Sequence, residues 1–398
     1  MHAETAIDGP GDNLNQRTSS SCAPYAWFML TPARTQPKEF PRRKAQGPLR
    51  ARVGDELARL EAHWPAANVY PASPAPSFAW LSAARIAFSE TNELRVLTAD
   101  RDGLTLAATA LAATRHGLTW RWMPLGSELG EPTDLAGHDP RALGCLARSL
   151  IRLGQPIVLE RMPADSPALV AIRRAARGLA IVIKQMAEPE LGIELDESWV
   201  RPERNLSPAE QKQFARAKRE AERLGGVTTE IYSPDLLELP SLLDQVFQCE
   251  GPLRKADEET LTWQMSSAVF FRHYCEAACT AGLLRIGLVR IADRVAAAAI
   301  AIEQGSTLWL LRIACNPRYE SCQPGQLVVR EMLSYSAEAG IRQCELWGER
   351  HDWLRVWPIV RRPCVRVSIY PLTTAGAICA AMDGATALWR HVTRLVGR

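Results

Sequence analysis

Residues 314–325 read Ala314-Cys315-Asn316-Pro317-Arg318-Tyr319-Glu320-Ser321-Cys322-Gln323-Pro324-Gly325, and this stretch decides the fold. Three short apolar runs between residues 283 and 315 precede it and predict a three-stranded meander with short turns. An amphipathic helix is expected to follow over residues 325–339. Its start would present unpaired N–H groups and a partial positive charge, which suits a pyrophosphate. A Pro-Gly pair is also typical of an ordinary helix start, so the preceding meander carries the prediction.

The composition indicates a globular chain with two cores and excludes several classes of function. The 398 residues are 47% hydrophobic and 23% charged, and the net charge of +3 argues against a dedicated nucleic-acid surface. The 10 cysteines form no CxxC pair, so we expect buried reduced thiols, no metal site and a reducing, cytoplasmic location. No apolar window has the length of a membrane span, and the apolar patch at 26–30 is too short for a signal peptide.

Strand and helix patterns alternate and predict an α/β (α+β) fold with two lobes. We expect a disordered leader at 1–50, an N-terminal lobe at 51–190, a connector at 191–206, a second lobe at 207–372 and a final helix at 373–398. Each lobe would have a mixed central sheet flanked by helices. The expected strands cover 94–99, 105–113, 118–125, 156–160, 179–184, 227–232, 283–291, 295–303, 307–315, 343–347 and 365–370. The expected helices cover 140–151, 166–177, 208–224, 234–249, 258–281, 325–339 and 373–398.

Two local signals refine this division. Ser207, Pro208 and Glu210 form a capping box that starts a helix with balanced charge, so we interpret that helix as a solvated face. Prolines and several acids in residues 186–205 favour a connector there. The final helix is weakly amphipathic with a basic end (Arg390, His391, Arg394, Arg398), so packing on the domain or a partner is expected, and peripheral membrane association stays open.

Several stretches share their order with one known family. They are Phe78-Ala79-Trp80-Leu81, Glu222-Arg223-Leu224-Gly225-Gly226, Leu284-Arg285-Ile286, Ala298-Ala299-Ile300-Ala301, residues 310–319, Pro324-Gly325 and Leu346-Trp347-Gly348-Glu349-Arg350-His351-Asp352-Trp353 with Trp357. Over roughly residues 75–372 the chain resembles the GNAT superfamily of acyltransferases, in its CelD/BcsL-like branch. These proteins are also called BioF-type or cellulose-biosynthesis acetyltransferases, and they are distantly related to the FemAB ligases.

The resemblance implies tandem GNAT-like lobes, of which the second binds acetyl-CoA or another acyl-CoA. The pantetheine arm would pair with the edge of Ile313, Ala314 and Cys315, where that strand diverges from residues 343–347. The pyrophosphate would lie on the N–H groups from Cys322 to Gln326, which include those of Gln323 and Gly325. The sequence departs from the family loop at two positions: Cys322 stands where Arg or Gln is usual, and Leu327 replaces a second small residue.

Three residues are candidates for acid–base catalysis of acyl transfer. Tyr319 would protonate the leaving thiolate, or it would only bond a loop carbonyl. Glu345 and His351 would act as bases; alternatively, Glu345 points to solvent and His351 caps a following helix. Four tryptophans, Trp309, Trp347, Trp353 and Trp357, either pack in the core or line a groove for a sugar or acyl chain.

These features predict transfer of an acetyl or acyl group from acyl-CoA to an amine or hydroxyl acceptor, a small molecule or a saccharide. The family resemblance points to polysaccharide or envelope biosynthesis. Two alternatives stay open: a catalytically degenerate lobe pair that acts in binding or assembly, and a FemAB-like aminoacyl transferase. The acceptor, the acyl chain length and the oligomeric state are not readable from the sequence.

Overall fold

The computed structural model describes residues 47–65, 73–88, 92–116, 119–250, 258–347 and 356–396. The first part of the chain contains β1 (Arg50–Gly54), α1 (Phe78–Phe88), β2 (Leu94–Arg101), β3 (Leu104–His116), β4 (Thr119–Pro124), β5 (Ala136–Gly137), α2 (Pro140–Arg152), β6 (Ile157–Pro163), α3 (Pro167–Ala175) and β7 (Ala180–Glu194). Two short 3-10 helices, η1 (Ala58–His63) and η2 (Ser127–Leu129), lie between them.

The second part begins with two further 3-10 turns and then repeats the strand–helix alternation. Its elements are η3 (Glu197–Val200), η4 (Pro202–Asn205), α4 (Pro208–Arg223), β8 (Val227–Tyr232), α5 (Leu239–Cys249), α6 (Glu258–Thr280), β9 (Leu284–Ile291), β10 (Arg294–Gln304), β11 (Thr307–Cys315), η5 (Pro317–Cys322), α7 (Pro324–Glu338), β12 (Gln343–Leu346), β13 (Val360–Pro371) and α8 (Thr374–Val396). No helix in the described part of the chain is both long and apolar enough to cross a membrane.

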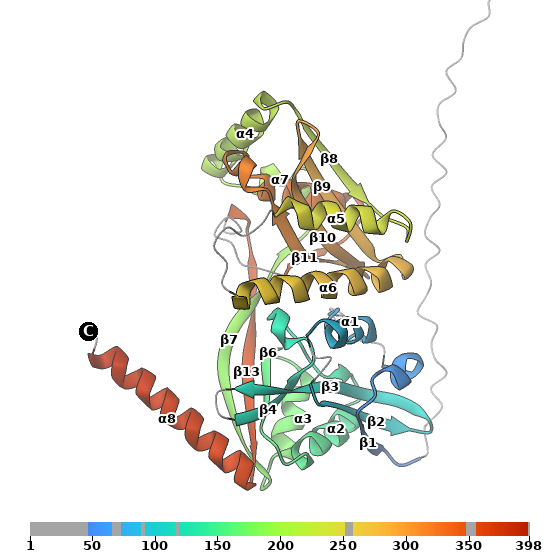
Figure 1. Cartoon of the computed structure of the whole chain (residues 1–398), viewed down its shortest axis with the longest axis vertical. Coiled ribbons are helices and arrows are strands. Elements are labelled where there is room, and N and C mark those ends of the chain that lie inside the picture. Colours follow the sequence, from blue (N-terminus) through green and yellow to red (C-terminus); the bar gives the residue numbers. More distant parts are fainter. Residues whose placement is uncertain are drawn as a thin grey trace, which may run out of the picture. The chain divides into compact units, whose positions relative to one another are not determined.

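One mixed sheet runs through both parts, so the expected α/β fold with flanking helices is confirmed (Figure 1). Its strand order is β1-β2-β3-β4-β6-β13-β7-β12-β11-β10-β9-β8, with β5 beside β3. The pairs β4–β6 and β11–β12 are parallel, and the other pairs are antiparallel. Strands β13 and β7 therefore join the strands of the N-terminal part to those of the C-terminal part.

The sheet is covered by helices that enclose three cores. The first core lies under α1, α5 and α6 and contains Trp80, Phe270 and Trp309. The second core lies on the opposite face of the C-terminal strands, under α4 and α7. The third core packs α2 and α3 on β2, β3, β6 and β13. Helices α1 and α6 share the first core, and Figure 1 shows them side by side.

Residues 186–194 correct the sequence interpretation, because they extend β7 and are not a connector. They pair with β13, and residues 191–194 also pair with β12. Pro189 is accommodated at a register shift of the β7–β13 ladder, where its missing N–H removes no regular bond, and its carbonyl accepts from Arg161 at 3.4 Å. The sequence also failed to predict α1. The expected leader lies outside the described residues up to residue 46.

Several local predictions are confirmed. Ser207 and Glu210 form the expected capping box of α4. The nine described cysteines are free, and eight of them are buried. The meander turn places Ala292 and Asp293 at φ of 49° and 62°, which is the geometry of a two-residue hairpin loop.

Candidate functional site

An unpaired strand edge lies where β11 diverges from β12. The parallel ladder pairs Thr307 with Gln343 at one end and Leu310 with Leu346 at the other. The last hydrogen bond of this ladder runs from the Trp347 N–H to the Leu310 carbonyl at 2.8 Å. Within the described residues, positions 311–315 of β11 have no ladder partner on the β12 side. The backbone groups that face this side are therefore available to a ligand with amide groups.

A β-bulge marks the same point. The β10–β11 register shifts between Ile300 and Ala301, so Leu311 has no residue opposite it. The bulge rotates the rest of β11. Leu311 and Ala314 belong to the first core, whereas Ile313 and Cys315 pack against the second core and stay partly exposed.

The loop after β11 is more closed than the sequence interpretation implies. Gln323 adopts a left-handed conformation (φ 46°, ψ 53°) between η5 and α7. Its N–H donates to Glu320, and its carbonyl accepts from the Gln326 N–H, both at 2.9 Å. Cys322 and Gln326 are buried. Two of the predicted phosphate donors are therefore used in turn hydrogen bonds.

The Gly325 amide interacts with a thiol of the preceding strand. This interaction with the Cys315 thiol, a weak acceptor, lowers the pKa of that thiol. Burial raises the pKa of the Cys315 thiol to about 11, and the Glu250 carboxylate adds to this effect, whereas the Gly325 bond opposes it. The thiol is therefore neutral near pH 7, and a phosphate oxygen would accept this amide proton more strongly.

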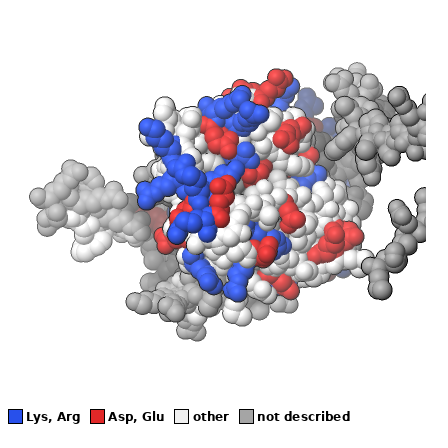
Figure 2. Space-filling view, turned by 90° about the horizontal axis from the view of Figure 1, so that it is seen from above, with Lys and Arg blue, Asp and Glu red and all other residues white. Residues whose placement is uncertain are grey.

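Basic side chains of α4 are found close to the loop. Lys212, Arg216, Arg219 and Arg223 are exposed on this helix. Arg223 pairs with Glu220 at 2.7 Å, and its pKa is raised mainly by that hydrogen bond, with a small contribution from Cys322 in the loop. Figure 2, seen from the α4 end, shows Lys and Arg gathered on one side of this face with acidic residues among them.

Tyr319 is buried in the second core. Its hydroxyl donates to the Ile291 carbonyl at 3.5 Å, and 5% of the residue is exposed. The alternative to catalysis was a bond to a loop carbonyl, and the acceptor here is the last residue of β9. A catalytic role for Tyr319 stays a prediction.

Glu345 lies in a buried charged cluster on the face of the sheet that carries the first core. One oxygen accepts from Arg362 of β13, and the other has no hydrogen-bond partner within the described residues. Glu345 itself is fully buried, so the alternative that it points to solvent is wrong. Glu190 of β7 completes the cluster, because its carboxylate lies 3.8 Å from the Arg362 Nε. Two carboxyl groups thus share one guanidinium.

Gly192 makes room for this cluster. A Cβ at that position would lie 2.5 Å from the Arg362 Nη2 and 2.8 Å from the nearer Glu345 oxygen. Gly192 is the cross-strand neighbour of Glu345, so only a residue without a side chain leaves the ion pair in place.

Two tryptophans border the cluster. Trp309 is the cross-strand neighbour of Glu345, and its indole N–H has no partner within the described residues. The Trp347 indole N–H donates to Glu190 at 3.2 Å, and its ring lies 4.8 Å from that of Trp309. Trp357 is buried in the second core, on the opposite face, so the expected groove of four tryptophans is wrong as a single surface.

The structure does not bring all the predicted site residues together. Glu345 lies on the face of the first core, and Tyr319 belongs to the second core on the opposite face. His351 and Trp353 lie outside the described residues. The cofactor residues Ile313 to Cys315 and Cys322 to Gln326 are joined through the Cys315–Gly325 bond.

Sequence reasoning missed Arg362, Glu190 and Arg312. Arg312 donates to Glu250 at 2.6 Å and lies over the rings of Phe247 and Phe271, next to the open edge. For Arg312 the available signal was a charge inside an otherwise apolar strand, whereas Glu190 and Arg362 lie in polar stretches that gave no such signal. That signal does not identify partners, since Glu190 and Trp347 are 157 positions apart.

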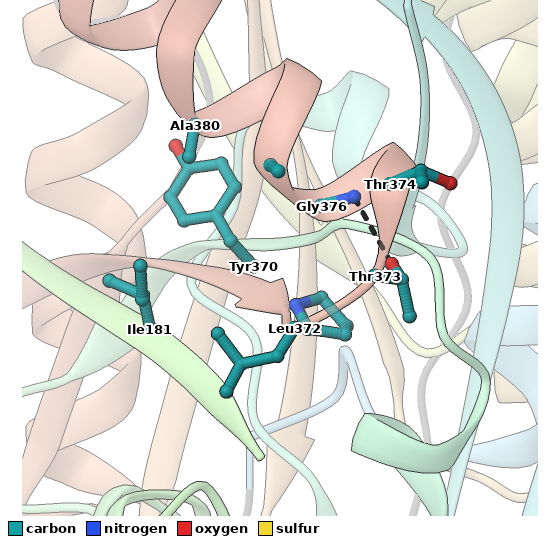
Figure 3. Close-up of a pocket in the computed structure, with 9 residues that line it drawn as sticks. Ile181, Tyr370, Leu372, Thr373, Thr374, Gly376 and Ala380 are labelled. Carbon is teal, nitrogen blue, oxygen red and sulfur yellow. Dashed lines mark hydrogen bonds between the residues drawn. The ribbon is translucent and has the colours of Figure 1, made fainter. Parts of the chain in front are cut away.

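A separate hollow of about 380 Å³ lies at the root of α8 (Figure 3). Ile181, Leu372 and Ala380 line it, together with Tyr370, whose hydroxyl donates to Asp383. The Gly376 N–H donates to the Thr373 hydroxyl at 3.2 Å at its rim. It has no carboxylate or imidazole in its lining and does not fit acyl transfer.

Comparisons with known proteins agree with this geometry. Residues 209–355 match the family model described as acetyltransferase (GNAT) domain. The match covers β8 to β12 and the loop of η5, and it ends before β13. No curated protein matches the sequence.

Solved structures share the architecture at low sequence identity. FemX superposes with a TM-score of 0.53 and 11% identity over 81% of this chain and 97% of that chain. A conserved protein of unknown function from Bacteroides thetaiotaomicron VPI-5482 superposes with a TM-score of 0.49 and 12% identity, over 80% of this chain and 99% of that chain. A tandem GNAT protein from the clavulanic acid biosynthesis pathway superposes with a TM-score of 0.42 and 14% identity, over 81% of this chain and 98% of that chain. The chain is therefore similar to FemX in fold, and its C-terminal part is similar in sequence to GNAT acetyltransferase domains.

Proposed function

We propose that the chain transfers an acetyl or acyl group from acyl-CoA to an amine or hydroxyl acceptor. The open edge of residues 311–315 carries this proposal, because it lies between a family-matched meander and the start of α7. The amide groups of a pantetheine arm would complete the ladder that β12 leaves at Leu310. The divisions 51–190 and 207–372 are our proposal for the two lobes.

The donor's pyrophosphate would lie at the start of α7. The Gly325 amide would exchange the Cys315 thiol for a phosphate oxygen, which is the stronger acceptor. The turn bonds of Gln323 and Gln326 leave fewer donors than an open cradle would have. Arg223 and the other basic side chains of α4 would add long-range attraction for the phosphates.

Glu345 would be the general base. Its unpartnered oxygen would accept the proton of the acceptor N–H or O–H. The acceptor's lone pair would then form a bond to the thioester carbonyl carbon, the C–S bond would break, and the thiolate would take a proton. We assign this last proton to Tyr319 as a prediction, and His351 remains an alternative base.

Arg362 would position Glu345. It holds one carboxylate oxygen, and the other oxygen lies against Gly192 of β7. The indoles of Trp309 and Trp347 would border the acceptor, which fits a small molecule or a saccharide. A role in polysaccharide or envelope biosynthesis, in the cytoplasm, stays part of this proposal.

Calorimetry with acetyl-CoA tests the donor site. We expect the wild type to bind and Gly325→Val to lose at least about tenfold in affinity, because a branched side chain would fill the approach to the α7 amides. Gly384→Val is the matched control, since that helical glycine has open space around it. No binding by the wild type at millimolar acetyl-CoA would overturn the transferase proposal. If Gly325→Val binds acetyl-CoA as tightly as the wild type, the phosphates do not bind at the start of α7.

A thiol-release assay over a panel of amine and hydroxyl acceptors tests the base. Glu345→Gln should lower the rate by about 10²-fold or more while acetyl-CoA affinity stays within about twofold. Tyr319→Phe should slow release only if the hydroxyl protonates the thiolate. If its bond to Ile291 is its whole role, the rate will match the wild type and the stability alone will fall.

A binding or assembly role is the second candidate function. The turn bonds within residues 320–326 favour it, because they occupy donors that a phosphate would need. Absence of acetyl-CoA binding with a correctly folded wild type would favour this candidate. If the chain instead transferred an aminoacyl group from aminoacyl-tRNA, as FemAB-like ligases do, incubation with aminoacyl-tRNA and an acceptor would yield deacylated tRNA.

A further inference from the structure

Arg312 is the charged residue of the open edge at 311–315. It is the first residue of β11 after the bulge, where it pairs with Ile300 of β10. Its side chain leaves the sheet on the side of α5 and α6 (Figure 1), and 11% of it is exposed. A cation held among apolar helices needs specific partners, and these partners define what the residue can do.

The Arg312 guanidinium is held by both helices. Its Nε and Nη2 donate to the two carboxylate oxygens of Glu250, at 3.1 and 2.6 Å, in a bidentate pair at the end of α5. Its Nη1 donates to the Ser267 hydroxyl of α6 at 3.4 Å. The rings of Phe247 on α5 and Phe271 on α6 lie 5.7 and 5.3 Å from the guanidinium carbon. One side chain therefore joins the open half of β11 to two helices.

A second contact from α5 reaches the same edge. The thiol of Cys249, the last residue of α5, donates to the Ala314 carbonyl at 3.8 Å. Glu250 is the C-cap of that helix, where the helix dipole disfavours a negative charge, so the carboxylate at this position is stabilised by Arg312 and not by the helix. The end of α5 is thus attached to β11 at Arg312 and at Ala314, the two residues that flank Ile313.

The ladder with β10 determines which groups of the edge face outward. The Asn316 N–H donates to the Ala296 carbonyl at 2.9 Å, so this pair is a hydrogen-bonded one. Hydrogen-bonded and non-hydrogen-bonded pairs alternate in an antiparallel ladder, so Ala314 and Arg312 also bond to β10. Ile313 lies between them, and its N–H and C=O therefore point away from β10, towards the side on which β12 has ended.

We propose that Arg312 is a positioning residue for the acyl donor. This inference rests on the proposed function, in which the pantetheine arm pairs with the open edge. Through its pair with Glu250, Arg312 keeps the edge ordered, and the outward groups of Ile313 keep the orientation that the donor's amide groups require. An edge that is already ordered loses less conformational entropy on binding, so the donor binds it more tightly than it would bind a mobile edge.

Calorimetry with acetyl-CoA, together with amide hydrogen exchange of residues 311–315, tests the inference. Arg312→Met keeps an apolar chain between the two phenylalanine rings but removes the bidentate pair. It should weaken acetyl-CoA binding by at least about tenfold and accelerate the exchange by a similar factor. Arg312→Lys keeps the charge but cannot form the bidentate pair, so its affinity should lie between those of the wild type and Arg312→Met.

Arg290→Met is the matched control. Arg290 of β9 donates to Gln245 of α5 at 2.7 Å, so it joins the same helix to the sheet away from the open edge. Its replacement should leave the acetyl-CoA affinity and the exchange at residues 311–315 within about twofold of the wild type, because the two sites share no partner.

The outcomes separate this inference from the proposed function. If the wild type binds acetyl-CoA and Arg312→Met binds it equally well, the inference is wrong and the donor site stands. Equal losses in Arg312→Met and Arg290→Met would reduce the effect to general stability and would also overturn the inference, as would unchanged exchange at residues 311–315. If the wild type fails to bind acetyl-CoA, the proposed function itself fails, and the positioning role fails with it.

Discussion

Replacement of Gly192 by alanine tests the charged cluster without removal of any of its charges. The new Cβ would lie 2.5 Å from the Arg362 Nη2, and 2.8 and 3.1 Å from the two Glu345 oxygens. All three distances are below van der Waals contact. Glu345 is fully buried and has no room to retreat, whereas the Arg362 side chain is 28% exposed. We therefore expect Arg362 to swing toward solvent and leave Glu345 without its partner.

The expected loss follows from this separation. A broken buried ion pair costs about 3–5 kcal/mol, and the partial exposure of Arg362 reduces the value to about 2–4 kcal/mol. The intrinsic preference for alanine over glycine returns roughly 0.5–1 kcal/mol. A net destabilisation of about 1–3.5 kcal/mol is therefore expected.

Urea unfolding followed by tryptophan fluorescence measures this loss. Gly54→Ala is the control, because that β1 glycine has no atom within 4 Å of a built Cβ and should change stability by less than about 0.5 kcal/mol. If Gly192→Ala also stays within 0.5 kcal/mol of wild type, Glu345 and Arg362 do not form the tight pair described above.

Three further changes have defined outcomes. Burial raises the pKa of Asp134 from 3.8 to about 6. The free energy of unfolding is therefore highest below pH 4 and falls as the pH rises toward 6. Asp134→Asn should remove this pH dependence and add about 2 kcal/mol to the free energy of unfolding at pH 7, in unfolding curves measured at several pH values. Ala292→Asn with Asp293→Gly should raise the free energy of unfolding by about 1 kcal/mol in urea unfolding curves, because both positions have positive φ. Asp383→Asn should cost about 2–3 kcal/mol, since Arg121 is buried, and should expose α8 to limited proteolysis before the rest of the chain.

The sequence predicted the parts of the fold whose signals are local. The meander, the loop and α7 were found because apolar periodicity and a Pro-Gly start coincide within residues 283–339. The full length of β7 was missed, because Pro189 and nearby acids are typical of a connector. Their tolerance in a strand depends on a register shift opposite Arg362, which is a property of the pairing with β13 and not of β7 alone.

The candidate site was predictable only in part, for the same reason. Glu345 stood out as a carboxylate in an apolar strand, but its partners come from β7 and β13. Cross-strand neighbours about 150 residues away leave no periodic signal in one sequence. The closed state of the loop was equally hidden, because the bond from Gly325 to Cys315 depends on how β11 turns after its bulge.

The position of β13 has a consequence for where the active unit ends. The family-matched segment stops at residue 355, yet Arg362 lies beyond it, and Glu190 and Gly192 lie before it. A fragment limited to 209–355 would keep the open edge and the α7 start but would leave Glu345 without its guanidinium. Since β13 also pairs with β6, the partner of Glu345 comes from a strand that is anchored in the N-terminal part of the sheet. In the proposed mechanism, the N-terminal part would therefore contribute by fixing the position of Glu345.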